Sequence, residues 1–178
     1  MAAFRRLMGL FATGVTVVAV EGPDGVHGMT ANAVCSVSLE PVLVLVCVDR
    51  RARLHDQLPP GRVFSINILR EDQESLSRFF AGSWPKPPPP EFRFLRWEHG
   101  PLLIGALGTV GCRTERLLDG GDHTIVLARV TGLQEGEPGR ALIFFGGRYR
   151  RLREAEDYVG APADEWTHET VRIYYDEW

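Results

Sequence analysis

The chain has 178 residues, of which 44% are hydrophobic and 24% charged, and its mean hydropathy is −0.09. This composition supports one folded domain of ordinary size and excludes the disordered, collagenous and disulfide-scaffold classes. A formal charge of −3 gives no broad positive field, so we expect neither a nucleic-acid nor an anionic-membrane partner.

The first part of the chain predicts a helix followed by strands. Apolar residues at helical spacing between Phe4 and Phe11 predict a short amphipathic helix that ends near Gly14. The β-branched run 15–20 and the extended stretch 27–39, with turn residues between them, predict a hairpin.

The middle of the chain predicts two more strands and a second helix. The runs 41–48 and 63–69 are apolar and of strand length, and the charged segment 49–58 between them has room for a helical turn. Residues 71–81 show a helical apolar face, with Gly82 at the expected C-terminal cap.

The last part of the chain predicts strands at 106–118, 123–133 and 141–145, the first two joined by the glycine-rich turn 119–122. The acidic and aromatic segment 155–178 forms either a further strand or an arm on a partner subunit. Most gaps between the roughly seven strands are too short for parallel crossovers, which need about a dozen residues. We therefore predict a mainly β fold, an antiparallel barrel with short peripheral helices.

Small and hydroxyl-bearing residues interrupt the stretch 27–39. Thr30, Asn32, Ser36 and Ser38 offer hydroxyl and amide donors with little bulk. Such donors suit the carbonyl groups of a planar heterocycle or the oxygens of a phosphate. The alternative is that they face solvent on an alternating strand.

Two further features have both a functional and a structural interpretation. The arginine-rich segment 49–54 matches phosphate chemistry, because guanidinium groups and helix-terminal N–H groups bind phosphate, but it is also typical of a solvated charge run. His123 follows a tight turn that places its imidazole either at the mouth of the barrel or idle in solvent.

Several common catalytic and metal-binding patterns are absent from the sequence. There is neither a phosphate-binding P-loop motif nor a Rossmann glycine motif, and the five histidines are scattered, so we expect no metal site. The three cysteines include no C-x-x-C pair, and the N-terminus lacks the pattern of a signal peptide. Both features predict a cytoplasmic protein.

Six short motifs occur together in the order and spacing of one family. The sequence resembles the short-chain flavin reductases, the reductase components of two-component flavin monooxygenases, over about residues 4–153. The motifs are FATGVTVV at 11–18, GMTAN at 28–32, SVSLEP at 36–41, FSINIL at 64–69, FFAG at 79–82 and GDH at 121–123.

The resemblance implies a flavin-binding split β-barrel, a homodimer, and an NAD(P)H:flavin oxidoreductase. Such an enzyme uses NADH or NADPH to reduce FMN or FAD, and its reduced flavin supplies a separate monooxygenase. We expect residues 1–158 to form the flavin reductase-like domain and residues 159–178 a C-terminal extension. Two alternatives are an enzyme that keeps its flavin and acts directly on an organic substrate, and a non-enzymatic flavin or haem carrier.

The resemblance also implies the site residues. The isoalloxazine ring, the ribityl chain and the phosphate or adenylate end would be bound by Thr30, Ala31, Asn32, Ser36, Val37, Ser38, Asp49, Arg51, Ala52, Arg53 and Leu54. Phe80, Ala81 and Gly82 would close the pocket, with Gly147, Arg148 and Tyr149 near the dinucleotide. His123 would lie beside the nicotinamide as an auxiliary residue that positions the ring.

Overall fold

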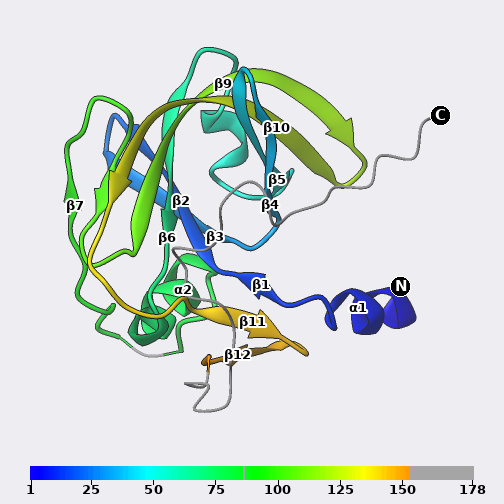
Figure 1. The fold of residues 1–178 in the computed structure, drawn as a ribbon. Helices are drawn as coiled ribbons and strands as arrows, with labels where there is room; N and C mark the ends of the chain where they lie inside the picture. Colours follow the sequence, from blue (N-terminus) through cyan, green and yellow to red (C-terminus); the bar gives the residue numbers. More distant parts are fainter. Residues whose placement is uncertain (86, 153–178) are drawn as a thin grey trace, which may run out of the picture.

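The computed structural model describes residues 1–85 and 87–152, which form a mainly β structure with short helices (Figure 1). The predicted extension 159–178 and the end of the predicted domain at residue 158 lie outside the described residues. In chain order the elements are α1 (Ala2–Met8), β1 (Thr13–Gly14), β2 (Thr16–Gly22), β3 (Gly25–Ala31), β4 (Val34–Leu39), β5 (Val42–Asp49), the 3-10 helix η1 (His55–Gln57), β6 (Val63–Ile68), the 3-10 helix η2 (Glu71–Gln73), α2 (Glu74–Phe80), β7 (Phe94–Leu95), β8 (Leu102–Leu103), β9 (Gly108–Gly120), β10 (His123–Glu135), β11 (Ile143–Phe145) and β12 (Arg148–Arg150).

Seven strands form one antiparallel sheet in the order β3-β2-β6-β9-β10-β5-β4. The strands at the two ends of this order, β3 and β4, are consecutive in the chain, so the sheet curls until they meet at the turn between them (Figure 1). This arrangement confirms the predicted antiparallel split β-barrel with peripheral helices. A three-stranded sheet, β1-β11-β12, and the pair β7-β8 lie outside the main sheet.

The N-terminal helix is shorter than predicted. It ends at Met8, not near Gly14, because the chain turns after Gly9 and then enters β1. There Thr13 is paired with Phe144 and Gly14 with Ile143. The backbone of these residues is therefore used in a sheet and is not available to extend the helix.

The prediction of one extended stretch over 27–39 is wrong. β3 pairs with β2 at one end of the main sheet, whereas β4 pairs with β5 at the other end. The chain changes neighbours at residues 32–33, where the carbonyl of Ala33 accepts a hydrogen bond from the N–H of Cys47 at 3.0 Å. This switch from one end of the sheet to the other brings the two ends of the barrel together.

The core has two parts, and β2 contributes to both. Val18 packs inside the barrel with Val46 and Phe64, whereas Val17 packs against a second cluster that contains Leu76 of α2. Both valines are completely buried. A strand buried on both faces needs no polar alternation, which explains the uninterrupted apolar run that predicted this strand.

A buried asparagine holds β8 against the barrel. The Nδ2 of Asn67 donates to the carbonyl of Val17 at 3.1 Å, and its Oδ1 accepts hydrogen bonds from the N–H of Leu103 at 2.8 Å and the hydroxyl of Thr109 at 2.9 Å. Asn67 is 0% exposed and Thr109 3% exposed. A neutral amide that satisfies this many buried groups fixes the relative positions of β2, β6, β8 and β9.

Replacing Asn67 with alanine is expected to lower the free energy of unfolding by about 2 to 4 kcal/mol, because the buried donors of Leu103 and Thr109 lose their acceptor. Denaturant unfolding followed by circular dichroism measures this change. As a control, Gln134→Ala removes an exposed amide and should change stability by less than about 0.5 kcal/mol. Equal stability of the two variants would contradict a structural role for Asn67.

Candidate functional site

A pocket lies between β3, α2 and the loop that follows β5. Its volume is about 790 Å³. We call it the β3–α2 pocket. Its lining residues are Val26, His27, Gly28, Met29, Thr30, Ala52, Arg53, Leu54, Phe79, Phe80, Ala81 and Gly82. Seven of the residues predicted to bind a cofactor therefore meet here, although they come from three segments far apart in the sequence.

Aromatic packing forms the wall of the pocket on the side of α2. The ring of Phe80 packs edge-on against Phe79 and Phe92, with centroids 5.2 and 5.0 Å apart, and this arrangement is favourable for aromatic pairs. Gly28 lets the β3 backbone approach this ring, because a Cβ at that position would lie 2.7 Å from it. Any side chain at position 28 would therefore displace the wall of the pocket.

Hydrogen bonds join β3, α2 and β12 behind this wall. The hydroxyl of Thr30 donates to the carbonyl of Ser77 at 2.7 Å, and the Ser77 hydroxyl lies 2.8 Å from the Tyr149 hydroxyl. A smaller cavity of about 180 Å³ is lined by Thr30, Asn32, Ala81 and Tyr149, among others. Tyr149 is thereby placed next to the predicted site, whereas Gly147 and Arg148 lie exposed at the turn between β11 and β12.

The two arginines of segment 49–54 that were predicted as phosphate partners differ in their surroundings. Arg51 forms a two-pronged ion pair with Asp49, with Nε–Oδ1 and Nη2–Oδ2 distances of 3.1 and 2.7 Å. This guanidinium holds the pKa of the Asp49 carboxyl well below its usual range. Arg53 lines the pocket and forms no ion pair with any described residue. Leu54, which is buried, contributes to the wall.

His123 lies beside Asp49, where the loop after β5 begins, and is outside the lining of the β3–α2 pocket. It begins β10 directly opposite Asp49 on β5, and its side chain is 41% exposed. Its Nδ1 is 2.7 Å from Oδ1 of Asp122, and the hydrogen bond and charge of the imidazole lower the pKa of the Asp122 carboxyl. The second ring nitrogen, Nε2, is left without a hydrogen bond to the described residues.

The predicted residues of β4 lie away from the pocket. Ser36 and Val37 are exposed on this edge strand, and the register with β5 shifts between Ser36 and Ser38. The Ser38 hydroxyl accepts a hydrogen bond from the N–H of Glu40 at 3.2 Å. Their role in flavin binding stays a prediction. In the single described chain, these residues lie on the outer edge strand of the barrel.

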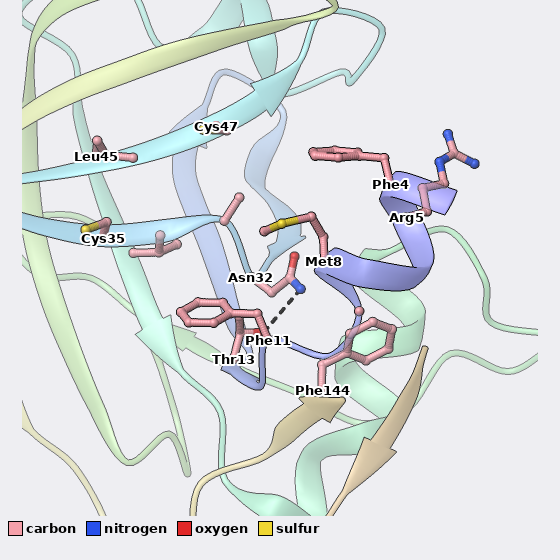
Figure 2. Close-up of a pocket in the computed structure, with 13 residues that line it drawn as sticks. Phe4, Arg5, Met8, Phe11, Thr13, Asn32, Cys35, Leu45, Cys47 and Phe144 are labelled. Atoms are coloured by element: carbon pink, nitrogen blue, oxygen red, sulfur yellow. Dashed lines mark hydrogen bonds between the residues drawn. The ribbon is translucent and has the colours of Figure 1, made fainter. Parts of the chain in front are cut away.

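Asn32 and the buried Ala31 occupy the junction between β3 and β4. Asn32 donates to the Thr13 hydroxyl at 3.2 Å, and both residues line a separate apolar cavity beside α1 (Figure 2). Asn32 lines that cavity as well as the smaller one next to Tyr149.

Sequence reasoning missed His27, Met29 and Phe79 as lining residues of the β3–α2 pocket. His27 was treated only as one of several scattered histidines, yet it lies on the same strand as Thr30. Phe79 precedes Phe80 on the predicted apolar face of α2. Their nearness to predicted site residues was the available signal.

Comparison with known proteins defines the class of this chain. Residues 8–153 match the family model described as flavin reductase like domain. An NADH-dependent FAD reductase from Streptomyces globisporus is 40% identical over 158 residues, covering 86% of each chain. The reductase component of 4-hydroxyphenylacetate 3-monooxygenase from Thermus thermophilus is 42% identical over 150 residues, covering 84% of this chain and 95% of the relative.

A solved structure agrees with these sequence matches. Flavin reductase PheA2 in its native state superposes with a TM-score of 0.80 at 38% identity, covering 86% of this chain and 98% of that one. The chain therefore belongs to the flavin reductase-like family. Among the described residues, no helix is long and apolar enough to cross a membrane.

Proposed function

We propose that the β3–α2 pocket binds the flavin, that the chain transfers hydride to it from NADH, and that the reduced flavin then supplies a separate monooxygenase. The observation that carries this proposal is the meeting of Thr30, Arg53 and Phe80, from three distant segments, around one cavity. Family membership supports the reaction, and the relative named as the reductase component of a monooxygenase supports the delivery.

The residues of the pocket fit a flavin. A volume of about 790 Å³ lies within the range of small-molecule sites. Phe79, Phe80 and Met29 give apolar surface for a planar ring system, and the guanidinium of Arg53 offers paired donors for a phosphate. FMN and FAD both carry such a phosphate.

The enzyme is an oxidoreductase in which the bound flavin supplies the hydride acceptor, its N5, for the C4 hydride of the nicotinamide. The protein aligns the two reactants, and no side chain has to act as a nucleophile. Phe80 would exclude water from one side of the bound flavin, and Arg53 would hold its phosphate end. His123 would act as a positioning residue: its imidazole, oriented by Asp122, would hold the nicotinamide.

A steady-state assay tests this function. Purified protein is expected to oxidise NADH in the presence of free FMN or FAD, and a crossed design with NADPH and riboflavin defines both specificities. Transfer of the filtered, reduced flavin to a separate oxygenase tests delivery. If no pair of nicotinamide and flavin turns over, the proposed reductase function is wrong. A flavin that stays bound through gel filtration and catalysis would favour an enzyme acting directly on an organic substrate.

We further propose that the enzyme is a cytoplasmic homodimer. Free Cys35, Cys47 and Cys112 support a reducing compartment. Exposed apolar side chains at the β4–β5 hairpin, Leu39 at 87% and Val42 at 44%, support self-association through that end of the barrel. Light scattering should then give twice the chain mass of 19.9 kDa.

A further inference from the structure

The imidazole of His55 joins two segments that contribute to the candidate site. His55 begins the 3-10 helix η1, two residues after Arg53. Its Nε2 reaches β10, where it lies 2.8 Å from the hydroxyl of Thr124, the residue after His123. Its Nδ1 lies 2.7 Å from Oδ1 of Asp56 in its own segment. His55 therefore connects the loop that carries Arg53 to the strand that carries His123.

The partners of His55 define the role of each ring nitrogen. A carboxylate can only accept a hydrogen bond, so Nδ1 donates its proton to Asp56. In a neutral imidazole the other nitrogen carries no proton, so Nε2 accepts the hydrogen bond from the hydroxyl of Thr124. The Asp56 side chain is 94% exposed, so its pair with His55 contributes little, whereas Thr124 is only 8% exposed. The bond to Thr124 is therefore the one that can hold the loop in place.

Apolar side chains alone do not fix the orientation of this loop. Leu54 is 3% exposed and Leu58 is completely buried, so both hold the loop on the barrel core. The N–H of His55 donates to the carbonyl of Ala52 at 3.0 Å, which makes the turn that contains Arg53 compact. Burial of apolar surface is not directional, so the two leucines leave the loop free to turn about the line that joins them. A hydrogen bond has a preferred direction, and the bond to Thr124 can supply it.

Strand β10 is a firm support for this bond, because it is paired with β5 on one side and β9 on the other. No other described side chain of residues 50–58 forms a hydrogen bond to β10. We propose that His55 is a positioning residue that, through Thr124, orients the loop so that the guanidinium of Arg53 meets the flavin phosphate. This role rests on the proposed binding of that phosphate by Arg53.

Flavin affinity measured without NADH tests this role. His55→Asn keeps a polar group near Asp56 but is too short to reach Thr124, whereas His55→Gln places an amide near the position of Nε2 and can keep that bond. We expect His55→Asn to raise the Kd for FMN by about three- to tenfold and to leave the Kd for riboflavin nearly unchanged. His55→Gln should stay close to the unmodified protein. Titrations that follow flavin fluorescence measure both constants.

Variants of Thr124 give the same comparison from the other side of the bond. Thr124→Val has nearly the same shape but lacks the hydroxyl, so it should reproduce the FMN-specific loss of His55→Asn. Thr124→Ser keeps the hydroxyl and should not. Asp56→Ala is the matched control, because it removes only the exposed partner of His55 and should change neither constant. Circular dichroism establishes that each variant is folded.

Combination with Arg53→Ala separates positioning from general loosening. If His55 acts through Arg53, His55→Asn adds no further loss of FMN affinity to the Arg53→Ala variant. A further loss in that background, or equal losses of FMN and riboflavin affinity, would overturn the proposal. So would unchanged FMN affinity in both His55→Asn and Thr124→Val while Arg53→Ala shows its loss. If Arg53→Ala itself leaves the preference for FMN over riboflavin unchanged, the proposed phosphate site is wrong, and the role of His55 is wrong with it.

Discussion

Arg53→Ala is expected to raise the KM for FMN and FAD by about tenfold or more while leaving the KM for riboflavin nearly unchanged, because riboflavin has no phosphate for the guanidinium to bind. Arg53 lines the β3–α2 pocket and has no carboxylate partner among the described residues. Steady-state kinetics with the three flavins at fixed NADH measure the difference. Because the side chain is accessible to solvent, the preference for FMN over riboflavin should decrease as salt increases.

Arg51→Ala is the matched control for this prediction. The residue belongs to the same loop, but its side chain is 88% exposed and its guanidinium is bound to Asp49. We expect a small change in KM for every flavin. Equal losses of FMN affinity in the two variants would mean that the loop acts by its net charge. An equal loss of riboflavin affinity in Arg53→Ala would mean that Arg53 contacts the ring and not the phosphate.

The sequence could not predict that Arg51 is paired with Asp49 whereas Arg53 is available to a ligand. Both follow a strand end in one basic run, so composition assigns them the same chemistry. The difference arises because the Asp49 carboxylate also accepts the backbone N–H of Arg51, at 2.8 Å, which turns that side chain back onto the strand end. A local hydrogen bond, and not the residue type, decides which arginine is available.

The strands were easier to predict than the path between them. The apolar runs that became β2, β5 and β10 each contribute buried valines to the barrel, so their hydrophobic composition indicates where they lie. The break at residues 32–33 left no comparable signal, because neither glycine nor proline marks it. It depends on the hydrogen bond between Ala33 and Cys47, a contact between residues distant in the sequence.

The candidate site also depends on contacts between distant residues that sequence patterns do not predict. The pocket containing Thr30, Arg53 and Phe80 could be anticipated only through the family motifs, since no periodicity relates these residues. Ser36 and Ser38 belong to the same motif series but lie on the outer edge strand in one chain. Motif order therefore identified the family, whereas the distribution of the motif residues around one cavity required the three-dimensional structure.

His123→Ala is expected to lower kcat/KM for NADH by a factor corresponding to about 1 to 3 kcal/mol of transition-state stabilisation, with flavin affinity nearly unchanged. The reason is geometric. His123 lies outside the lining of the β3–α2 pocket, at the opposite end of the loop that contributes Arg53. Hydride transfer needs no proton from the imidazole, so the loss should be that of a positioning group and not of a nucleophile.

Asp122→Asn distinguishes the orientation of the imidazole from its charge. The amide oxygen can still accept the Nδ1–H that Asp122 now binds at 2.7 Å, but the negative charge is removed. If orientation is what matters, this variant should keep most of the NADH kcat/KM that His123→Ala loses. Wild-type kcat/KM in His123→Ala would instead assign the side chain to solvent. A loss of FMN affinity in that variant, measured by fluorescence titration without NADH, would show that the imidazole serves the flavin and not the nicotinamide.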